Sequence, residues 1–163
     1  MKTKIIYSIV IALALIVFIS LVATKDEGVM LTGLPPRTVC ASLADAKASA
    51  EAYYAAHGGI IMPIAGTGSM APYIPAAAKG ADPMAVIAYA VTDPSIGYDQ
   101  IQKGQLVIYA PGWTSGSVIH QAAEKDADGW IMSGLHNAHY ESRWRVSSFN
   151  FTAVGGAVFT VVP

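Results

Sequence analysis

The sequence contains one cysteine and few charged residues. The first shortage excludes an internal disulfide bond, and the second argues against a nucleic-acid-binding surface. Cys40 alone cannot form an internal disulfide bond, and we expect it to be a small buried or linker residue. Charged residues make up 13% of the 163 residues, the formal net charge is -1, and no cluster of lysine and arginine occurs. A nucleic-acid-binding surface needs such a basic cluster. We therefore expect no nucleic acid among the partners.

The long apolar run of the chain lies at its N-terminus. Residues 5–23 carry no charge and, as a helix, would span about 28 Å of a hydrocarbon layer about 30 Å thick. A cleaved signal peptide has a shorter apolar stretch, and a small residue where Leu21 stands. Lys2 and Lys4 precede the run, and cationic residues stay on the cytoplasmic side. We therefore expect residues 1–24 to be a single-pass membrane anchor with a cytoplasmic N-terminus and an extracytoplasmic remainder.

Residues 25–58 are expected to hold a spacer and a helix. Glycine and proline recur in residues 24–40 and break regular structure, as suits a chain leaving a bilayer. The alanine-rich residues 41–57 have good helix propensity. Ser42, with an acidic residue three positions later, predicts the start of this helix, and the glycines after His57 predict its end.

Beyond residue 58 the pattern changes to short apolar runs separated by turn residues, which is typical of strands. Residues 126–129, Asp-Ala-Asp-Gly, predict a hairpin turn. We therefore expect residues 59–163 to be a β-rich domain and the whole fold to be mainly β. The expected strands cover residues 59–65, 84–91, 105–110, 117–123, 129–133 and 153–162.

Residues 66–72 read Gly-Thr-Gly-Ser-Met-Ala-Pro, follow an apolar run and predict a turn that contains Ser69. A serine hydroxyl near neutral pH is a poor nucleophile, and it needs a nearby base and donors for the oxyanion. Gly68 lets a substrate backbone approach closely, and Pro72 fixes the turn that follows.

This loop resembles the nucleophile box of the signal peptidase I family, whose pattern is small-x-Ser-Met-x-Pro. The resemblance implies that the hydroxyl of Thr67 joins the Ser69 amide in the oxyanion hole. It also makes Gly68, Met70 and Pro72 the residues that we expect to contact the substrate.

His120 and Glu141 are the residues expected to activate Ser69. Residues 118–121, Val-Ile-His-Gln, resemble the family box that supplies the base, which is histidine in the archaeal and endoplasmic-reticulum branch. Imidazole has a suitable pKa for a base at neutral pH. Residues 134–137, followed by Glu141, resemble the acidic box, and this implies that Glu141 orients and stabilises the imidazolium.

The resemblance covers residues 1–23 and 60–145 and implies a coiled β domain with serine endopeptidase activity. The expected reaction is cleavage of signal peptides or related exported precursors through an acyl-enzyme, without metal or cofactor. The implied substrate is an extended chain with small residues at the first and third positions before the cut. The implied partners are therefore an exported preprotein or peptide and the lipid bilayer.

Two other functions stay open. Lys79 lies among alanines and could serve as the base of a Ser-Lys peptidase if it were desolvated. Gln105 and Leu135 stand where the family has acidic residues, which favours a catalytically silent membrane-tethered module that keeps a peptide groove. A weaker pattern is a metal site built from His136, His139 and Glu141.

Overall fold

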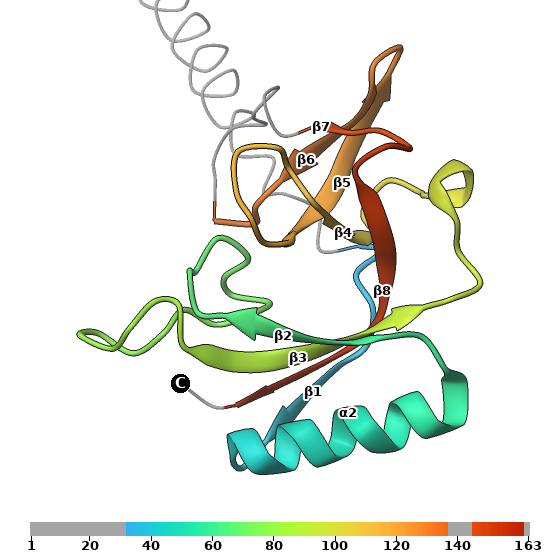
Figure 1. The fold of residues 1–163 in the computed structure, drawn as a ribbon. Helices are drawn as coiled ribbons and strands as arrows, with labels where there is room; N and C mark the ends of the chain where they lie inside the picture. Colours follow the sequence, from blue (N-terminus) through green and yellow to red (C-terminus); the bar gives the residue numbers. More distant parts are fainter. Residues whose placement is uncertain (1–31, 137–144, 162–163) are drawn as a thin grey trace, which may run out of the picture. The chain divides into compact units, whose positions relative to one another are not determined.

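The computed structural model describes residues 32–136 and 145–161, which form a curled sheet with a helix packed on one face (Figure 1). The predicted anchor, residues 1–24, lies outside the described residues. Within the two described ranges, no helix is long and apolar enough to cross a membrane.

The fold is mainly β, as the sequence predicts, and its strands form one continuous hydrogen-bonded sheet. The strand order is β2-β3-β8-β4-β5-β6-β7, with β1 added in parallel to β8. The strand bounds are β1 Arg37–Cys40, β2 Ile61–Ala65, β3 Val86–Asp93, β4 Leu106–Tyr109, β5 Val118–Asp126, β6 Gly129–Ser133, β7 Arg145–Val146 and β8 Phe151–Val161.

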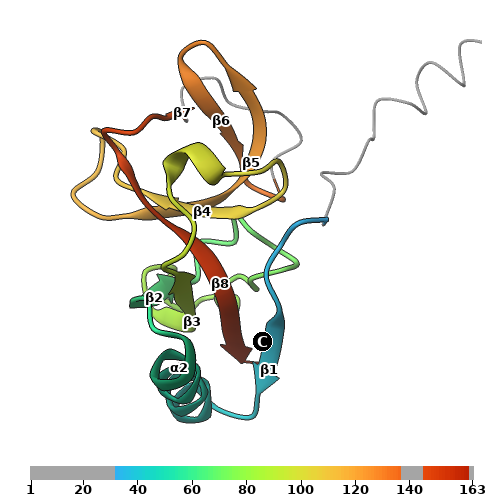
Figure 2. The same ribbon diagram turned by 90° about the vertical axis from the view of Figure 1, so that its right-hand side faces the viewer.

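Strand β8 runs through both halves of the sheet. It pairs antiparallel with β3 over most of its length, with β4 near its start and in parallel with β1 near its end. Figure 2 shows the sheet curling above β8, where β4, β5 and β6 turn over the lower strands. The pairing is irregular between Val91 and Thr92 and again between Ile108 and Tyr109, and such irregularities bend and twist strands.

Helix α2 spans Leu43–His57 and confirms the alanine-rich helix that the sequence predicts. The side chain of Ser42 accepts a hydrogen bond from the backbone N–H of Asp45 at 3.1 Å, so the predicted capping interaction is present. Gly58 closes the helix with a positive φ of 76°.

The helix packs on the sheet through its smallest side chains. Ala46 and Ala50 are fully buried and lie in one cluster with Val91 of β3 and Phe159 of β8. An alanine face lets the helix axis approach the sheet closely, because no longer side chain separates them.

The stretch that we expected to be a spacer contains a strand, and this part of the prediction is wrong. Arg37–Cys40 pairs residue by residue with Val158–Val161, and the Val158 N–H also donates to Pro36 O at 2.9 Å. Cys40 is buried, with 8% of its surface exposed. The sequence gives no sign of β1, because a four-residue strand lacks a measurable period and its partner lies about 120 residues away.

The predicted hairpin is confirmed. Asp126 at the end of β5 pairs directly with Gly129 at the start of β6, which leaves a two-residue turn. The Asp128 N–H donates to the Asp126 carboxylate at 2.9 Å, as is usual for aspartate in turns. Arg145 of β7 forms an ion pair with the same carboxylate and ties β7 to the hairpin.

The helix–sheet contact generates the first prediction. Ala50→Leu adds three carbon atoms where no space exists, so it should lower the free energy of unfolding by about 1–3 kcal/mol. Ala48→Leu is the matched control, because Ala48 is exposed on the same helix and should change stability by less than about 0.5 kcal/mol. Chemical denaturation of the full chain in mild detergent, followed by circular dichroism, measures both. Equal stabilities of the two variants would contradict the packing described for α2.

Candidate active site

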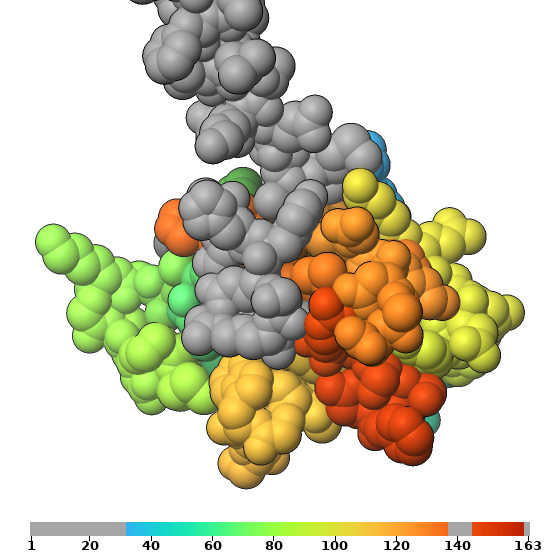
Figure 3. All heavy atoms as spheres, turned by 90° about the horizontal axis from the view of Figure 1, so that it is seen from above, coloured from blue at the N-terminus to red at the C-terminus, as the bar shows by residue number. Residues whose placement is uncertain are grey.

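Ser69 lies in the long connection between β2 and β3, and the base of this loop is closed by backbone hydrogen bonds. The Gly66 N–H donates to Ala85 O at 3.1 Å, and the Gly66 carbonyl accepts from the Ala77 N–H at 2.9 Å. The far part of the connection, residues 78–85, is exposed and projects from one side of the molecule (Figure 3). The Ser69 turn therefore sits on a fixed base, whereas the tip beyond it lies in solvent.

The two glycines of the serine loop make room for the chain itself. A Cβ at Gly66 would lie 2.7 Å from the Ala77 nitrogen, which is closer than real side chains come. Gly68 has a φ of +81°, and a Cβ there would lie 3.1 Å from the Ala76 Cβ. Both glycines are thus required for the loop to fold, in addition to the substrate contact predicted for Gly68.

Met70 and Pro72, the other predicted substrate contacts, lie on opposite sides of the loop. Met70 is 2% exposed and packs in a core cluster with Ile64 and Leu106, so it holds the loop from inside. Pro72 is exposed, and its carbonyl accepts a hydrogen bond from Arg37 Nη1 at 2.8 Å. Substrate contact stays a prediction for both residues.

Thr67 and Ser69 lie close together in the serine loop. Their hydroxyl oxygens lie 3.4 Å apart, within hydrogen-bond distance. The Thr67 side chain is exposed and Ser69 is half-buried, so both hydroxyls can be reached from solvent. An exposed hydroxyl beside the serine can donate to a developing oxyanion, and this is the role expected for Thr67.

His120 lies on β5 and is buried, with 3% of its surface exposed. Its Nδ1 atom lies 3.1 Å from the hydroxyl oxygen of Tyr109 on the neighbouring strand β4. Burial lowers the pKa of His120 to about 4, because a charged imidazolium is poorly solvated there. Burial also raises the pKa of Tyr109, so its hydroxyl keeps its proton. For Nε2 to act as a base, Nδ1 must carry the proton and donate it to Tyr109.

Within the described residues, the Ser69 hydroxyl bonds to Thr67 and makes no hydrogen bond to the His120 ring. Ile119 packs against the cluster that contains Met70, and successive strand residues face opposite sides of a sheet. The His120 side chain therefore leaves β5 on the side of Tyr109, away from Met70. Glu141, the predicted third member, lies outside the described residues.

A backbone contact nevertheless links the serine loop to the strands that carry the histidine. The His136 N–H donates to the Ser69 carbonyl at 3.1 Å, and His136 lies three residues after the end of β6. Ser133, at that end, pairs with Gln121, the residue next to His120. The serine loop and β5 thus share one short segment as a common neighbour.

The alternative base Lys79 lies in the exposed tip of the β2–β3 connection. A lysine acts as a base near neutral pH only when burial disfavours its charged form. Its position therefore does not favour the Ser-Lys mechanism. His139 and Glu141, two of the three residues in the metal pattern, lie outside the described residues.

Gln121 and Gln105 both have structural roles. Gln121 is buried, and its amide nitrogen donates to Gly104 O at 2.7 Å and to Thr32 O at 3.3 Å. Gln105 accepts from the backbone N–H of Gln102 at 2.8 Å and closes the turn before β4. Gln121 thus holds β5 against the backbone at residues 32 and 104, and Gln105 stabilises the turn that leads into β4.

Sequence reasoning missed Tyr109 and Arg37. Tyr109 is one of four consecutive apolar residues of β4, and nothing in that run marks its hydroxyl as the partner of a histidine. Arg37 lies in the stretch expected to be a spacer, 35 residues before the carbonyl that it binds. The role of Tyr109 follows from the register between β4 and β5, and the role of Arg37 follows from the packing of the serine loop against β1.

The burial of His120 predicts a pH-dependent stability. Its folded pKa of about 4 lies below the unfolded value of about 6.5, so the unfolded state binds more protons between these values. The free energy of unfolding should therefore fall by up to about 3 kcal/mol as the pH drops from 6.5 to 4. His120→Gln should flatten this dependence, whereas His57→Gln, at the exposed end of α2, should leave it unchanged. Denaturation curves of the three proteins across this range provide the measurement, and a slope that survives His120→Gln would contradict the assignment.

No protein-family model, curated protein or solved structure matches this chain.

Proposed function

We propose that the chain is a membrane-anchored serine endopeptidase resembling signal peptidase I of the histidine branch. Its substrates are signal peptides or related exported precursors, and its anchor holds the β domain outside the cytoplasm. Ser69 is the nucleophile, His120 the base and Glu141 the acidic partner. Thr67 and the Ser69 amide bind the oxyanion. The observation that carries this proposal is the pair of adjacent, solvent-accessible hydroxyls of Thr67 and Ser69 in a loop fixed on three sides.

The reaction is acyl transfer. His120 accepts the Ser69 proton, the Ser69 oxygen bonds to the substrate carbonyl carbon, and the carbonyl π electrons move to the oxygen held by Thr67. The peptide C–N bond then breaks, and His120 returns the proton to the leaving amine. Water then attacks the ester carbonyl carbon while His120 accepts its proton. The ester C–O bond breaks, and His120 returns the proton to the Ser69 oxygen. For this step the Ser69 hydroxyl must come within about 3 Å of an imidazole nitrogen, and because the described residues show no such bond, the mechanism requires the contact to form when substrate binds.

The nucleophile assignment predicts that Ser69→Ala abolishes cleavage. Loss of a nucleophilic hydroxyl costs about 10⁴-fold to 10⁶-fold in kcat, while the fold should keep its stability because the side chain is half-buried in a loop. Ser117→Ala, in the exposed turn before β5, is the control and should leave cleavage unchanged. Cleavage of a preprotein by the purified full chain, followed on a gel, tests both. Undiminished cleavage by Ser69→Ala would rule out the proposed enzyme.

The base assignment predicts unequal effects of His120→Ala and Lys79→Ala. Cleavage should nearly vanish in the first variant and change little in the second, because Lys79 is exposed. Only neutral imidazole accepts a proton, and burial lowers the pKa of His120 to about 4. The acid limb of kcat/KM should therefore lie below pH 6.5, the ordinary value for histidine. The reverse ranking of the two variants would favour the Ser-Lys mechanism.

A specific observation favours a second candidate, the catalytically silent membrane-tethered peptide-binding module. His120 is buried and bound to Tyr109, and Ser69 is bound to Thr67, so each group has a structural partner without the other. In such a module, Ser69→Ala and His120→Gln would leave peptide affinity nearly unchanged and the wild type would cleave nothing. Cleavage that disappears in the Ser69→Ala variant separates the enzyme from the module.

A further inference from the structure

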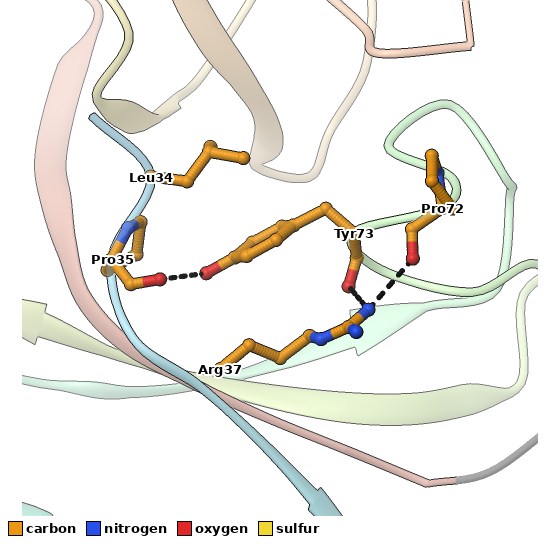
Figure 4. A pocket seen from close by; sticks show the side chains of 5 residues that line it. All are labelled: Leu34, Pro35, Arg37, Pro72 and Tyr73. Carbon is orange, nitrogen blue, oxygen red and sulfur yellow. Dashed lines mark hydrogen bonds between the residues drawn. The ribbon is translucent and has the colours of Figure 1, made fainter. Parts of the chain in front are cut away.

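Two adjoining cavities lie beside the serine loop, on the face of the sheet opposite α2. One, of about 280 Å³, is lined by Leu34, Pro35, Arg37, Pro72 and Tyr73 (Figure 4). The other, of about 420 Å³, is lined by Arg37, Val39, Pro72, Pro75, Ala76, Thr160 and Val161. They share Arg37 and Pro72, so we treat them as one groove and name it the Arg37 groove. Its wall is the segment that directly follows Ser69.

Arg37 is fixed in the groove by bonds that use only part of its guanidinium. Nη1 donates to Pro72 O and to Tyr73 O, both at 2.8 Å, as the dashed lines in Figure 4 show. The guanidinium also lies over the Tyr73 ring, 5.8 Å from its centre. The Tyr73 hydroxyl in turn donates to Pro35 O at 2.6 Å. The position of the charge is thus determined by a small network from β1 and the serine loop.

The other donors of Arg37 are available to a ligand. In the described residues, no hydrogen bond or salt bridge uses Nη2 or Nε, and the side chain is exposed. These two nitrogens form the planar fork that binds both oxygens of a carboxylate. Because Nη1 is already held, the fork needs little ordering when a carboxylate binds.

Beyond Arg37 and Tyr73 the lining of the groove is apolar, apart from the hydroxyl of Thr160. Val39 is 51% exposed although it is a strand residue, and Pro75 and Ala76 add small apolar surfaces from the wall. The Thr160 hydroxyl is buried without a hydrogen-bond partner among the described residues. An unsatisfied buried hydroxyl is costly, and a ligand group that reaches it would remove that cost.

We infer that the Arg37 groove binds an acidic residue of the extended peptide substrate, together with the small apolar residues beside it. The inference rests on the proposed function, because the groove begins three residues after Ser69. A single cation in an apolar lining matches one carboxylate within a peptide. An anionic membrane surface is instead recognised by clusters of lysine and arginine, which this groove lacks.

The test compares peptides that differ only in one acidic side chain. A cleavable peptide is scanned with Asp and with Asn at each position within four residues of the cut, and the Asp/Asn ratio of kcat/KM is measured. We expect one position where this ratio is about tenfold or more in the wild type, as for a hydrogen-bonded charge. Arg37→Gln should bring the ratio to about one, and Arg37→Lys should keep part of it. The Asp/Asn ratio reports the contact between Arg37 and the acidic side chain alone, because any disturbance of the serine loop by Arg37→Gln affects both peptides alike.

Arg145→Gln is the matched control, because Arg145 is paired with Asp126 on the other half of the sheet and should leave the ratio unchanged. The same peptide pairs, labelled with a fluorophore, are also bound to Ser69→Ala protein and to its Arg37→Gln double variant. An Arg37-dependent preference for Asp in binding supports the groove even if no peptide is cleaved, which separates it from the proposed function.

Two outcomes would contradict the inference that the Arg37 groove binds an acidic residue of the peptide. One is cleavage and binding that do not distinguish Asp from Asn at any position. The other is a preference that persists in Arg37→Gln.

Binding to vesicles containing 30% phosphatidylserine is the final comparison, with the full chain held in nanodiscs of neutral lipid. Loss of vesicle binding in Arg37→Gln, without any peptide preference, would assign the groove to a lipid headgroup instead.

Discussion

The continuity of strand β8 is the constraint on which the rest of the molecule depends. Its eleven residues pair with β3 and β1 near the C-terminus and with β4 near the start, so one strand joins both halves of the sheet. Val154 and Val158 on this strand are buried in different clusters, one with β4 to β7 and the other with the serine loop. The serine loop follows a strand on one side of β8, and His120 lies on a strand on the other. Their separation is therefore determined by the path of a single strand.

The serine loop is held by contacts from three distant parts of the chain. Its base hydrogen bonds to Ala85, just before β3, Met70 enters the core, and Arg37 of β1 binds the carbonyls that follow the turn. The backbone and the apolar side chains of the loop thus make the contacts that hold it in place. The hydroxyls of Thr67 and Ser69 are left accessible beside each other. This division is what a nucleophile requires, since a hydroxyl in a mobile loop gains little from nearby donors.

The sequence predicts well the features that depend on neighbours along the chain. The capping at Ser42, the alanine helix, the turn at residues 126–129 and the apolar runs of the long strands are local patterns, and the structure confirms them. Features that depend on distant pairing could not be predicted. The strand at Arg37–Cys40 exists because β8 offers it an edge, and Tyr109 meets His120 because of register between β4 and β5. Gly68 was predicted to let a substrate approach, and its second role, a positive φ beside Ala76, depends on a contact within the loop that the sequence does not show.

The electrostatics of His120 separate the two candidate functions. Burial alone lowers its pKa to about 4, and an imidazole with so low a pKa is a weak base toward a serine hydroxyl. A carboxylate beside the ring favours the charged form and raises the pKa, and in a peptidase this is the contribution expected from Glu141. A peptide-binding module needs no such carboxylate, because in it the neutral histidine only bonds to Tyr109 through Nδ1 and transfers no proton. If Glu141→Gln lowers the pKa of His120 and slows cleavage together, the carboxylate serves proton transfer. An unchanged His120 pKa in that variant is what the binding module requires.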